Sequence, residues 1–358
     1  MTIREATRRY EGWLGRHTPL MRTDLALKHR EMAIGVFPFL RATFYRWMQL
    51  WAEVCGDLAR APSVLAVGDL HVENFGTWRD SEGRLIWGIN DFDETYRLSY
   101  TVDLVRLAVS ARLAIAGDHL AIKAKDACGA ILEGYAEGLR SGGRPYVLSE
   151  EHVWLREIAV GKERDPVLFW RKMRALRPSR GPVPVGAVAA IERLMPEPGL
   201  SYRLMRRVSG LGSLGRQRFV ALAEWRGGMV AREAKALVSS ACVWARNGSG
   251  AAPIMYQTVL DQAVRCRDPF VHVRDGWIVR RLSPYCSRIE LASLPARRDE
   301  YRLLHAMGWE TANVHLGTSR AVKAVLHDLT KRRSAWLRSA AKAMTRVTIR
   351  DWEEWGRR

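Results

Sequence analysis

The sequence predicts an α+β protein with two lobes, one rich in helices and one rich in strands, and three observations lead to this prediction. Apolar residues recur at helical spacing through much of the chain up to about residue 176. A stretch rich in proline, residues 177–184, then marks a boundary between lobes. Beyond it, short apolar runs alternate with glycine turns, which is typical of a meander of strands.

The bulk composition is that of a globular protein. The chain has 358 residues, of which 47% are hydrophobic, so it can bury a substantial core. No run of about 18 apolar residues occurs, and the first residues lack the apolar core of a secretory signal. Five cysteines without paired spacing argue against a disulfide framework and against a thiolate zinc site. We therefore expect a cytoplasmic protein with no membrane span.

The net charge of +19 is the strongest signal in the composition. A surplus of lysine and arginine attracts phosphates, acidic proteins, nucleic acids and anionic membranes, so the charge alone does not choose a partner. The basic residues are spread along the chain, and neither a zinc finger nor an RNA-binding aromatic signature accompanies them. A nucleic-acid function is therefore disfavoured, although the charge leaves it open.

The first half predicts helices around a strand and a hairpin. Apolar residues between Phe37 and Leu58 recur every three or four positions, which predicts one helix with a buried face. Residues 64–67 form a short apolar strand, and residues 84–89 form another after a turn cluster. Residues 102–116 are almost wholly apolar and predict a helix that is buried on most sides.

The second half predicts a small sheet followed by helices. Three strands form a meander, a helix over residues 254–266 follows, and a hairpin then turns at Asp275-Gly276. Residues 282–285, after the last strand, are the candidate hinge between lobes. The predicted strands are residues 201–208, 218–223, 229–235, 270–273 and 277–282.

These elements divide the chain into segments with different composition. We expect an N-terminal helical segment at residues 1–62, a helical lobe at 63–180 and a strand-rich lobe at 200–285. Residues 286–358 are expected to form C-terminal helices that pack on the helical lobe.

Two short acidic motifs in the first half indicate phosphoryl-transfer chemistry. Asp69-Leu-His-Val-Glu-Asn74 has the spacing of a kinase catalytic loop, in which an aspartate serves the acceptor hydroxyl and an asparagine binds magnesium. Asp91 and Asp93, in Asn90-Asp-Phe-Asp93, fit the metal-binding loop that follows. We therefore expect catalysis by Asp69 and Asn74, and metal binding by Asn74, Asp91 and Asp93.

The glycine-rich loop that would cover the phosphates follows these motifs by about 140 residues instead of preceding them. It reads Gly210-Leu-Gly212-Ser213-Leu-Gly215, and glycine lets backbone approach phosphate closely. The order strand, glycine loop, two strands, helix and two strands is that of a kinase amino-terminal lobe. The sequence thus predicts a protein-kinase-like fold that is circularly permuted.

A basic residue on the third strand of the meander is expected to bind the α- and β-phosphates. Lys235 is the preferred candidate and Arg232 its competitor, because the sequence leaves the facing direction of the strand open. We expect Gly210, Gly212, Ser213 and Gly215 to complete this cofactor-binding set.

Several of these residues also fit a purely structural role. His71 is kept as a catalytic candidate, although a histidine in this position is more often a hydrogen-bonding scaffold, and oxygen ligands favour magnesium or manganese over zinc. A glycine loop of this pattern is common, and Asp-Phe-Asp-Glu also fits a solvated turn. Asp103 is expected to hold the catalytic loop, because a buried aspartate needs hydrogen-bond partners. His315 is expected to be structural.

The motifs together resemble the DUF2252 family of bacterial proteins of unassigned function. The resemblance rests on segments 68–76, 90–95, 103–108 and 210–215, and the segments around Phe37, Lys235 and Asp268 fit it. The first motif is also similar to the corresponding loop of aminoglycoside and choline phosphotransferases.

The motifs and these resemblances lead us to expect a phosphotransferase that depends on ATP and on magnesium or manganese. Its partners would be a nucleotide and an unknown small molecule or protein that offers a hydroxyl. Two alternatives are a kinase-fold enzyme that transfers the nucleotide and a nucleotide-binding pseudokinase or regulator. A nucleic-acid-binding protein is the least favoured.

Overall fold

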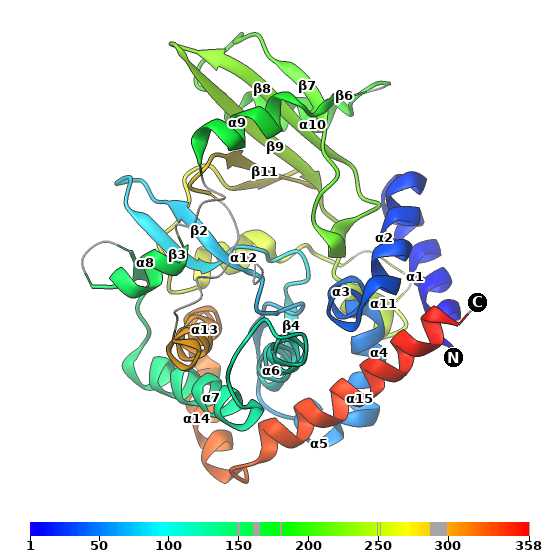
Figure 1. The fold of residues 1–358 in the computed structure, drawn as a ribbon, viewed down its shortest axis with the longest axis vertical. Coiled ribbons are helices and arrows are strands. Elements are labelled where there is room, and N and C mark those ends of the chain that lie inside the picture. Colours follow the sequence, from blue (N-terminus) through cyan, green and yellow to red (C-terminus); the bar gives the residue numbers. More distant parts are fainter. Residues whose placement is uncertain are drawn as a thin grey trace.

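The chain folds into a mixed α+β structure with antiparallel sheets (Figure 1). The computed structural model describes residues 1–148, 151–159, 165–179, 181–248, 250, 252–286 and 299–357. Residue 180, at the predicted end of the helical lobe, residues 287–298, near the start of the predicted C-terminal helices, and residue 358 lie outside the described residues.

The helices are α1 (Ile3–His17), α2 (Arg22–Ile34), α3 (Val36–Ala42), α4 (Phe44–Val54), α5 (Gly56–Ala59), α6 (Thr101–Ala116), α7 (Ala124–Ser141), α8 (Val153–Ala159), α9 (Pro166–Arg174), α10 (Val185–Glu192), α11 (Ala241–Ala245), α12 (Tyr256–Gln262), α13 (Glu300–His315), α14 (Val322–Lys331) and α15 (Trp336–Gly356). The strands are β1 (Ser63–Ala66), β2 (Phe75–Arg79), β3 (Leu85–Ile89), β4 (Tyr96–Ser99), β5 (Tyr146–Val147), β6 (Arg177–Pro178), β7 (Arg203–Arg206), β8 (Arg218–Trp225), β9 (Gly228–Ala236), β10 (His272–Arg274) and β11 (Trp277–Leu282).

The largest sheet has the strand order β10-β11-β9-β8-β7-β6 and lies at the top of Figure 1. The turns at Arg226-Gly227 and Asp275-Gly276 all have positive φ, as two-residue turns that match the twist of a hairpin require. The meander and the hairpin predicted from the sequence are therefore confirmed.

The two faces of this sheet differ in character, and the difference decides which side chains reach the site. Ala234 and Val279 lie on one face and pack under α10 in an apolar cluster. Alternate residues of a strand share a face, so Glu233 and Lys235 lie on the other face, away from Arg232. That second face carries apolar residues at one end and charged residues at the other.

The helical part surrounds α6, which packs against α7 and α15, while α13 packs along α7 (Figure 1). Asp103, in the first turn of α6, is fully buried. Its carboxylate accepts hydrogen bonds from the backbone nitrogens of Val67 and Gly68, at 2.7 and 2.8 Å, and lies 2.9 Å from Nε2 of His315. The expected structural roles of Asp103 and His315 are therefore confirmed. None of the described helices has the length and apolarity that a membrane span needs.

The single helix predicted between Phe37 and Leu58 is wrong, because this segment forms α3, α4 and α5. The chain leaves helical geometry at Thr43 and Cys55, where φ is −125° and −129°. At the first break, the hydroxyl of Thr43 donates to the carbonyl of Phe39 at 2.7 Å. Apolar residues continue in phase through both breaks, so periodicity alone does not reveal them. The helix predicted over residues 254–266 is likewise shorter, because α12 spans Tyr256–Gln262.

A substitution at Gly68, which precedes the first acidic motif, tests how tightly the two acidic loops pack. Its φ is +88°, and a Cβ atom there would lie 2.4 Å from the carbonyl oxygen of Glu94. We expect Gly68→Ala to lower the free energy of unfolding by about 3 to 4 kcal/mol through strain and overpacking together. Urea unfolding measures this.

Gly83 provides the matched control, since its φ is +73° and nothing lies within 4 Å of the added Cβ. Gly83→Ala should cost only the backbone strain, about 1 kcal/mol. Equal losses in the two variants would contradict the close packing of Gly68 against Glu94.

Candidate functional site

A cavity of about 320 Å³ brings together motifs that are far apart in the sequence. Its lining includes Asp69 and Asn74 of the first acidic motif and Asp91 of the second. Gly210 and Gly212 line it as well, although the glycine loop lies about 140 residues further along the chain. The described residues therefore place the predicted catalytic, metal-binding and glycine-loop segments around one space.

Backbone contacts join the two acidic loops to each other. The backbone nitrogen of Asn90 donates to the carbonyl of Asn74 at 3.0 Å, at the point where β2 and β3 come together. Within the first loop, Oδ1 of Asn74 accepts a hydrogen bond from the backbone nitrogen of His71 at 2.7 Å. Nδ1 of His71 accepts one from the backbone nitrogen of Glu73 at 3.2 Å. His71 thus makes hydrogen bonds within the loop, as expected if its role is structural and not catalytic.

Asp69 is held by an arginine from the centre of the helical part. Nε and Nη2 of Arg106 donate to Oδ1 of Asp69 at 2.9 and 2.5 Å. The guanidinium of Arg106 is fully buried and also donates to the carbonyl of Leu40. Burial raises the pKa of Asp69 to about 7, although Arg106 acts in the opposite direction. Asp69 can therefore bind and release a proton near neutral pH.

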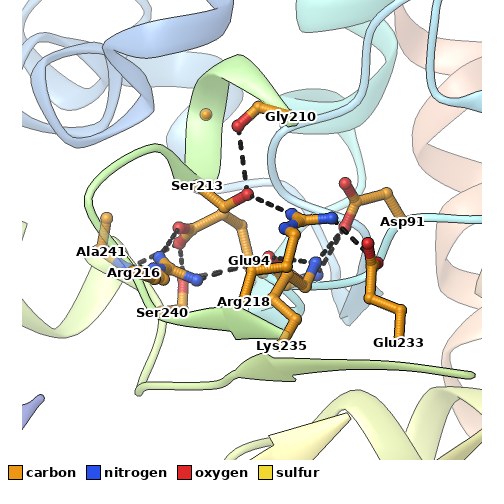
Figure 2. Close-up of polar contacts among 12 residues, drawn as sticks. Asp91, Glu94, Gly210, Ser213, Arg216, Arg218, Glu233, Lys235, Ser240 and Ala241 are labelled. Atoms are coloured by element: carbon orange, nitrogen blue, oxygen red, sulfur yellow. Dashed lines mark hydrogen bonds and ion pairs between the residues drawn. The ribbon is translucent and has the colours of Figure 1, made fainter. Parts of the chain in front are cut away.

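The glycine loop lies directly against this aspartate. A Cβ atom on Gly212 would be 3.6 Å from Oδ2 of Asp69 and 3.1 Å from the carbonyl oxygen of Arg41. Ser213 stabilises the loop, because its hydroxyl donates to the carbonyl of Gly210 at 3.1 Å and accepts from Nη2 of Arg218 at 2.8 Å (Figure 2). The close approach to the carbonyl oxygen of Arg41 favours a residue without a side chain at position 212, whereas the distance to Asp69 is that of an ordinary contact.

Lys235 and the second acidic motif form the junction between the sheet and the loops. Nζ of Lys235 donates to both carboxylate oxygens of Asp93, at 2.6 and 2.7 Å. The same nitrogen lies 3.7 Å from Asp91, whose side chain remains 45% exposed, whereas that of Lys235 is 3% exposed. Arg232 lies on the opposite face of β9 and donates to the carbonyl of Leu194 at 2.7 Å. Of the two phosphate-binding candidates, only Lys235 faces the acidic loops.

The carboxylates of this loop differ in what they can bind. Burial alone would raise the pKa of Asp91, but the charges of Lys235 and Arg280 outweigh it and hold that pKa below its usual value. Asp91 is therefore ionised and partly accessible, which suits a magnesium ligand. Asp93 has both oxygens occupied by Lys235. Oδ1 of Asn74 keeps a second lone pair for a cation beside its hydrogen bond from His71.

No group of three or more histidine, cysteine, aspartate or glutamate side chains is arranged to hold a metal ion in the described part of the chain. Asp91 and Asn74 would thus supply only part of an octahedral magnesium shell, which fits an ion that takes its other ligands from water and phosphate.

Glu94 connects the same loop to the segment that follows β9 in the sequence. Its carboxylate accepts hydrogen bonds from the hydroxyl of Ser240 at 2.9 Å and from the backbone nitrogen of Ala241 at 2.7 Å. Nη2 of Arg216 donates to it at 3.2 Å (Figure 2). Nη1 of Arg216 donates to Asp93 at 3.4 Å. The acidic loop is thus anchored by Arg216, which follows the glycine loop, and by the start of α11.

Sequence reasoning missed several of these residues. Arg106 had a visible signal, because a charge in a nearly apolar helix needs a buried partner. Arg216, Arg218 and Glu233 had none. The partners of Arg216 are 123 and 122 positions away, and the pairing of Arg218 with Glu233 depends on the register of β8 and β9.

Comparisons with known proteins give a family likeness for part of the chain. The model of a family described as an uncharacterised protein conserved in bacteria, DUF2252, matches residues 20–165. This segment contains both acidic motifs and supports the resemblance inferred from them. No curated protein and no solved structure matched the chain.

The unequal pairing of the two aspartates yields a prediction about stability. Asp93→Ala leaves the buried ammonium of Lys235 without its close partner, so we expect the free energy of unfolding to fall by about 3 to 5 kcal/mol. Asp91→Ala removes a longer, partly exposed contact and should cost less than about 1 kcal/mol. Urea unfolding of both variants at neutral pH measures the difference, and similar losses would show that Lys235 does not depend on Asp93.

Proposed function

We propose that this protein is an ATP- and magnesium-dependent phosphotransferase that acts on a hydroxyl group of a small molecule or protein. The observation that carries the proposal is the meeting of Asp69, Asn74, Asp91 and the glycine loop at one cavity. Phosphoryl transfer needs a carboxylate beside the attacking hydroxyl, oxygen ligands for a metal ion, and cations around the phosphates. Each requirement has a residue of suitable chemistry in this cavity.

We infer a kinase-like fold with permuted connectivity from the order of elements. β7, the glycine loop, β8, β9, the helices α11 and α12, and the hairpin β10-β11 follow one another in the order expected of a kinase amino-terminal lobe. The segment with the acidic loops precedes them in the chain. The proposed lobes are the sheet with α9 and α10, and the helical part around α6.

The cavity offers an apolar end for a nucleobase. Ile158, Phe169 and Leu282 line it, and Leu282 ends the apolar stretch of the same sheet face that carries Glu233 and Lys235. A nucleobase at this end would direct its phosphates along the face toward the glycine loop and Asp91.

In the proposed reaction, Asp69 accepts the proton of the acceptor hydroxyl. The acceptor oxygen forms a bond to the γ-phosphorus, the bond from that phosphorus to the β-γ bridging oxygen breaks, and ADP leaves. Asp91 and Asn74 would hold magnesium, which neutralises charge on the phosphates. Asp93 keeps Lys235 in place, and Arg106 orients Asp69.

The first experiment is a thermal unfolding measurement with ATP or GTP, with and without magnesium or manganese. We expect a nucleotide to raise the melting temperature when the metal is present, because a ligand that binds only the folded state stabilises it. Asp91→Ala should lose this shift, whereas Asp69→Asn should keep it. No shift with any nucleotide and metal would contradict the proposed function.

Turnover then separates catalysis from binding. Slow hydrolysis of ATP, with water as acceptor, should fall by at least about a hundredfold in Asp69→Asn if the carboxylate acts as general base. Wild-type hydrolysis in this variant would contradict its role. A product that carries the mass of a nucleotide instead of a phosphate would identify the enzyme as a nucleotidyltransferase.

The pKa of Asp69 predicts the pH dependence of that hydrolysis. Because a general base works only when ionised, kcat/KM should rise about tenfold per pH unit below pH 7 and level off above it, since the pKa is about 7. A level profile between pH 5 and 8 would show that Asp69 does not ionise in this range.

A further inference from the structure

Three arginines converge on a single buried glutamate beside the glycine loop. Glu233 is fully buried and forms ion pairs with Arg207, Arg218 and Arg280. Nε of Arg280 donates to Oε1 of Glu233 at 2.9 Å, and Nη2 of Arg280 lies 2.8 Å from the same oxygen. Nη1 of Arg218 also donates to this oxygen, at 2.9 Å. Arg207 donates to Oε2. We refer to Arg207, Arg218 and Arg280 as the arginine triad.

The arginine triad carries more positive charge than its partner neutralises. Among the residues that the structure describes, Glu233 is the one carboxylate within ion-pair distance of these guanidiniums, so one negative charge is in direct contact with three positive charges. Asp91 and Asp93 interact with Arg280 and Arg218 at longer range. Burial and the repulsion of Arg280 and Arg207 lower the pKa of Arg218, although Glu233 counteracts them. An anion bound at the triad would relieve this repulsion.

The arginine triad also faces the right space. All three arginines line the same cavity as Asp69 and Asp91. Arg207 and Arg280 keep 24% and 27% of their side-chain surface exposed, and Arg218 reaches Ser213 of the glycine loop. Lys235, in contrast, is almost completely buried and is occupied by Asp93.

We propose that the arginine triad is the binding site for the polyphosphate chain of the phosphate donor, and that Lys235 serves as a structural cation. The assignment rests on the proposed function for the identity of the donor, but the anion site itself depends only on the triad. This assignment differs from the sequence-based expectation that Lys235, on the third strand of the meander, binds the phosphates.

A polyphosphate chain is a better partner for three guanidiniums than one carboxylate alone. Each guanidinium presents five N–H donors in a plane and binds phosphate oxygens in pairs. Glu233 uses few of these donors, and its fixed position holds the guanidiniums in place before the ligand arrives. Asp91 lines the same cavity as Arg218 and Arg280, so it would be available to hold a magnesium ion for the same phosphate chain.

The test uses inorganic tripolyphosphate, which has the charged chain of ATP without its nucleoside. Binding to the full chain would be measured by calorimetry in EDTA at low and moderate salt, beside ATP and adenosine. We expect tripolyphosphate and ATP to bind without metal, with affinity that falls as salt rises, and adenosine to bind much more weakly.

Arg280→Gln and Arg207→Gln are the informative variants. Each leaves Glu233 with two guanidiniums, so the glutamate keeps its partners and the sheet should fold. Either change should weaken tripolyphosphate binding about tenfold or more, because charge-assisted hydrogen bonds to the ligand are lost. Arg274→Gln is the matched control, because Arg274 lies on the same sheet, is half exposed and pairs with Asp275.

Glu233→Gln gives a second readout in the opposite direction. It leaves the guanidiniums without their carboxylate, so the melting temperature in buffer should fall and tripolyphosphate should raise it by more than in the wild type. A smaller shift than in the wild type would argue against an anion site at the triad.

The proposal fails if tripolyphosphate does not bind, or if it binds Arg280→Gln and Arg274→Gln equally. Asp91→Ala separates this failure from failure of the proposed function, because it should lose metal-dependent nucleotide binding but keep metal-free tripolyphosphate binding. Binding of MgATP that survives the arginine changes would leave the proposed function standing and overturn the triad alone.

Discussion

Buried ion pairs between the acidic loop at residues 91–94 and the strands after the glycine loop determine the rest of the site. Lys235 pairs with Asp93, and Arg216 pairs with both Asp93 and Glu94. Buried pairs of this kind add little net stability, because desolvation offsets their attraction, but removing one partner is costly. These pairs connect the acidic loop to Lys235 on β9 and to Arg216, which follows the glycine loop. That arrangement leaves Asp91 as the accessible carboxylate and places the glycine loop over Asp69.

The N-terminal helices belong to the same arrangement. The backbone nitrogen of Met21 donates to the carbonyl of Gly215 at 2.8 Å, and Nζ of Lys28, on α2, donates to the carbonyl of Gly212 at 3.3 Å. Arg206, at the end of β7, pairs with Asp24 of α2. The glycine loop and the strand before it are thus also held by α2 and the residue that precedes it. A segment that composition separates from both lobes therefore helps to set the position of the loop.

The sequence predicts most elements of this fold and the meeting of its motifs, but it does not predict their pairing. Hairpin turns such as Asp275-Gly276 are local, so the residues themselves specify the strands beside them. The partner of Lys235 is 142 positions away and depends on strand register and on how the sheet sits over the loops. Sequence reasoning therefore left Lys235 and Arg232 as alternatives. It gave Asp93 a metal-binding role, whereas the structure shows that carboxylate engaged with Lys235.

The glycine loop connects the geometry of the cavity with the chemistry proposed for Asp69. Gly212 covers one oxygen of this aspartate, and Arg106 occupies the other. Burial raises the pKa of Asp69 to about 7, although the charge and hydrogen bonds of Arg106 lower it, so this carboxylate can act as a base near neutral pH. Asn74 and Asp91 line the same cavity as Asp69, and in the proposed reaction the acceptor hydroxyl would enter this space. In the proposed reaction, the glycine loop would thus limit the space beside the base and so restrict the direction from which a substrate reaches it.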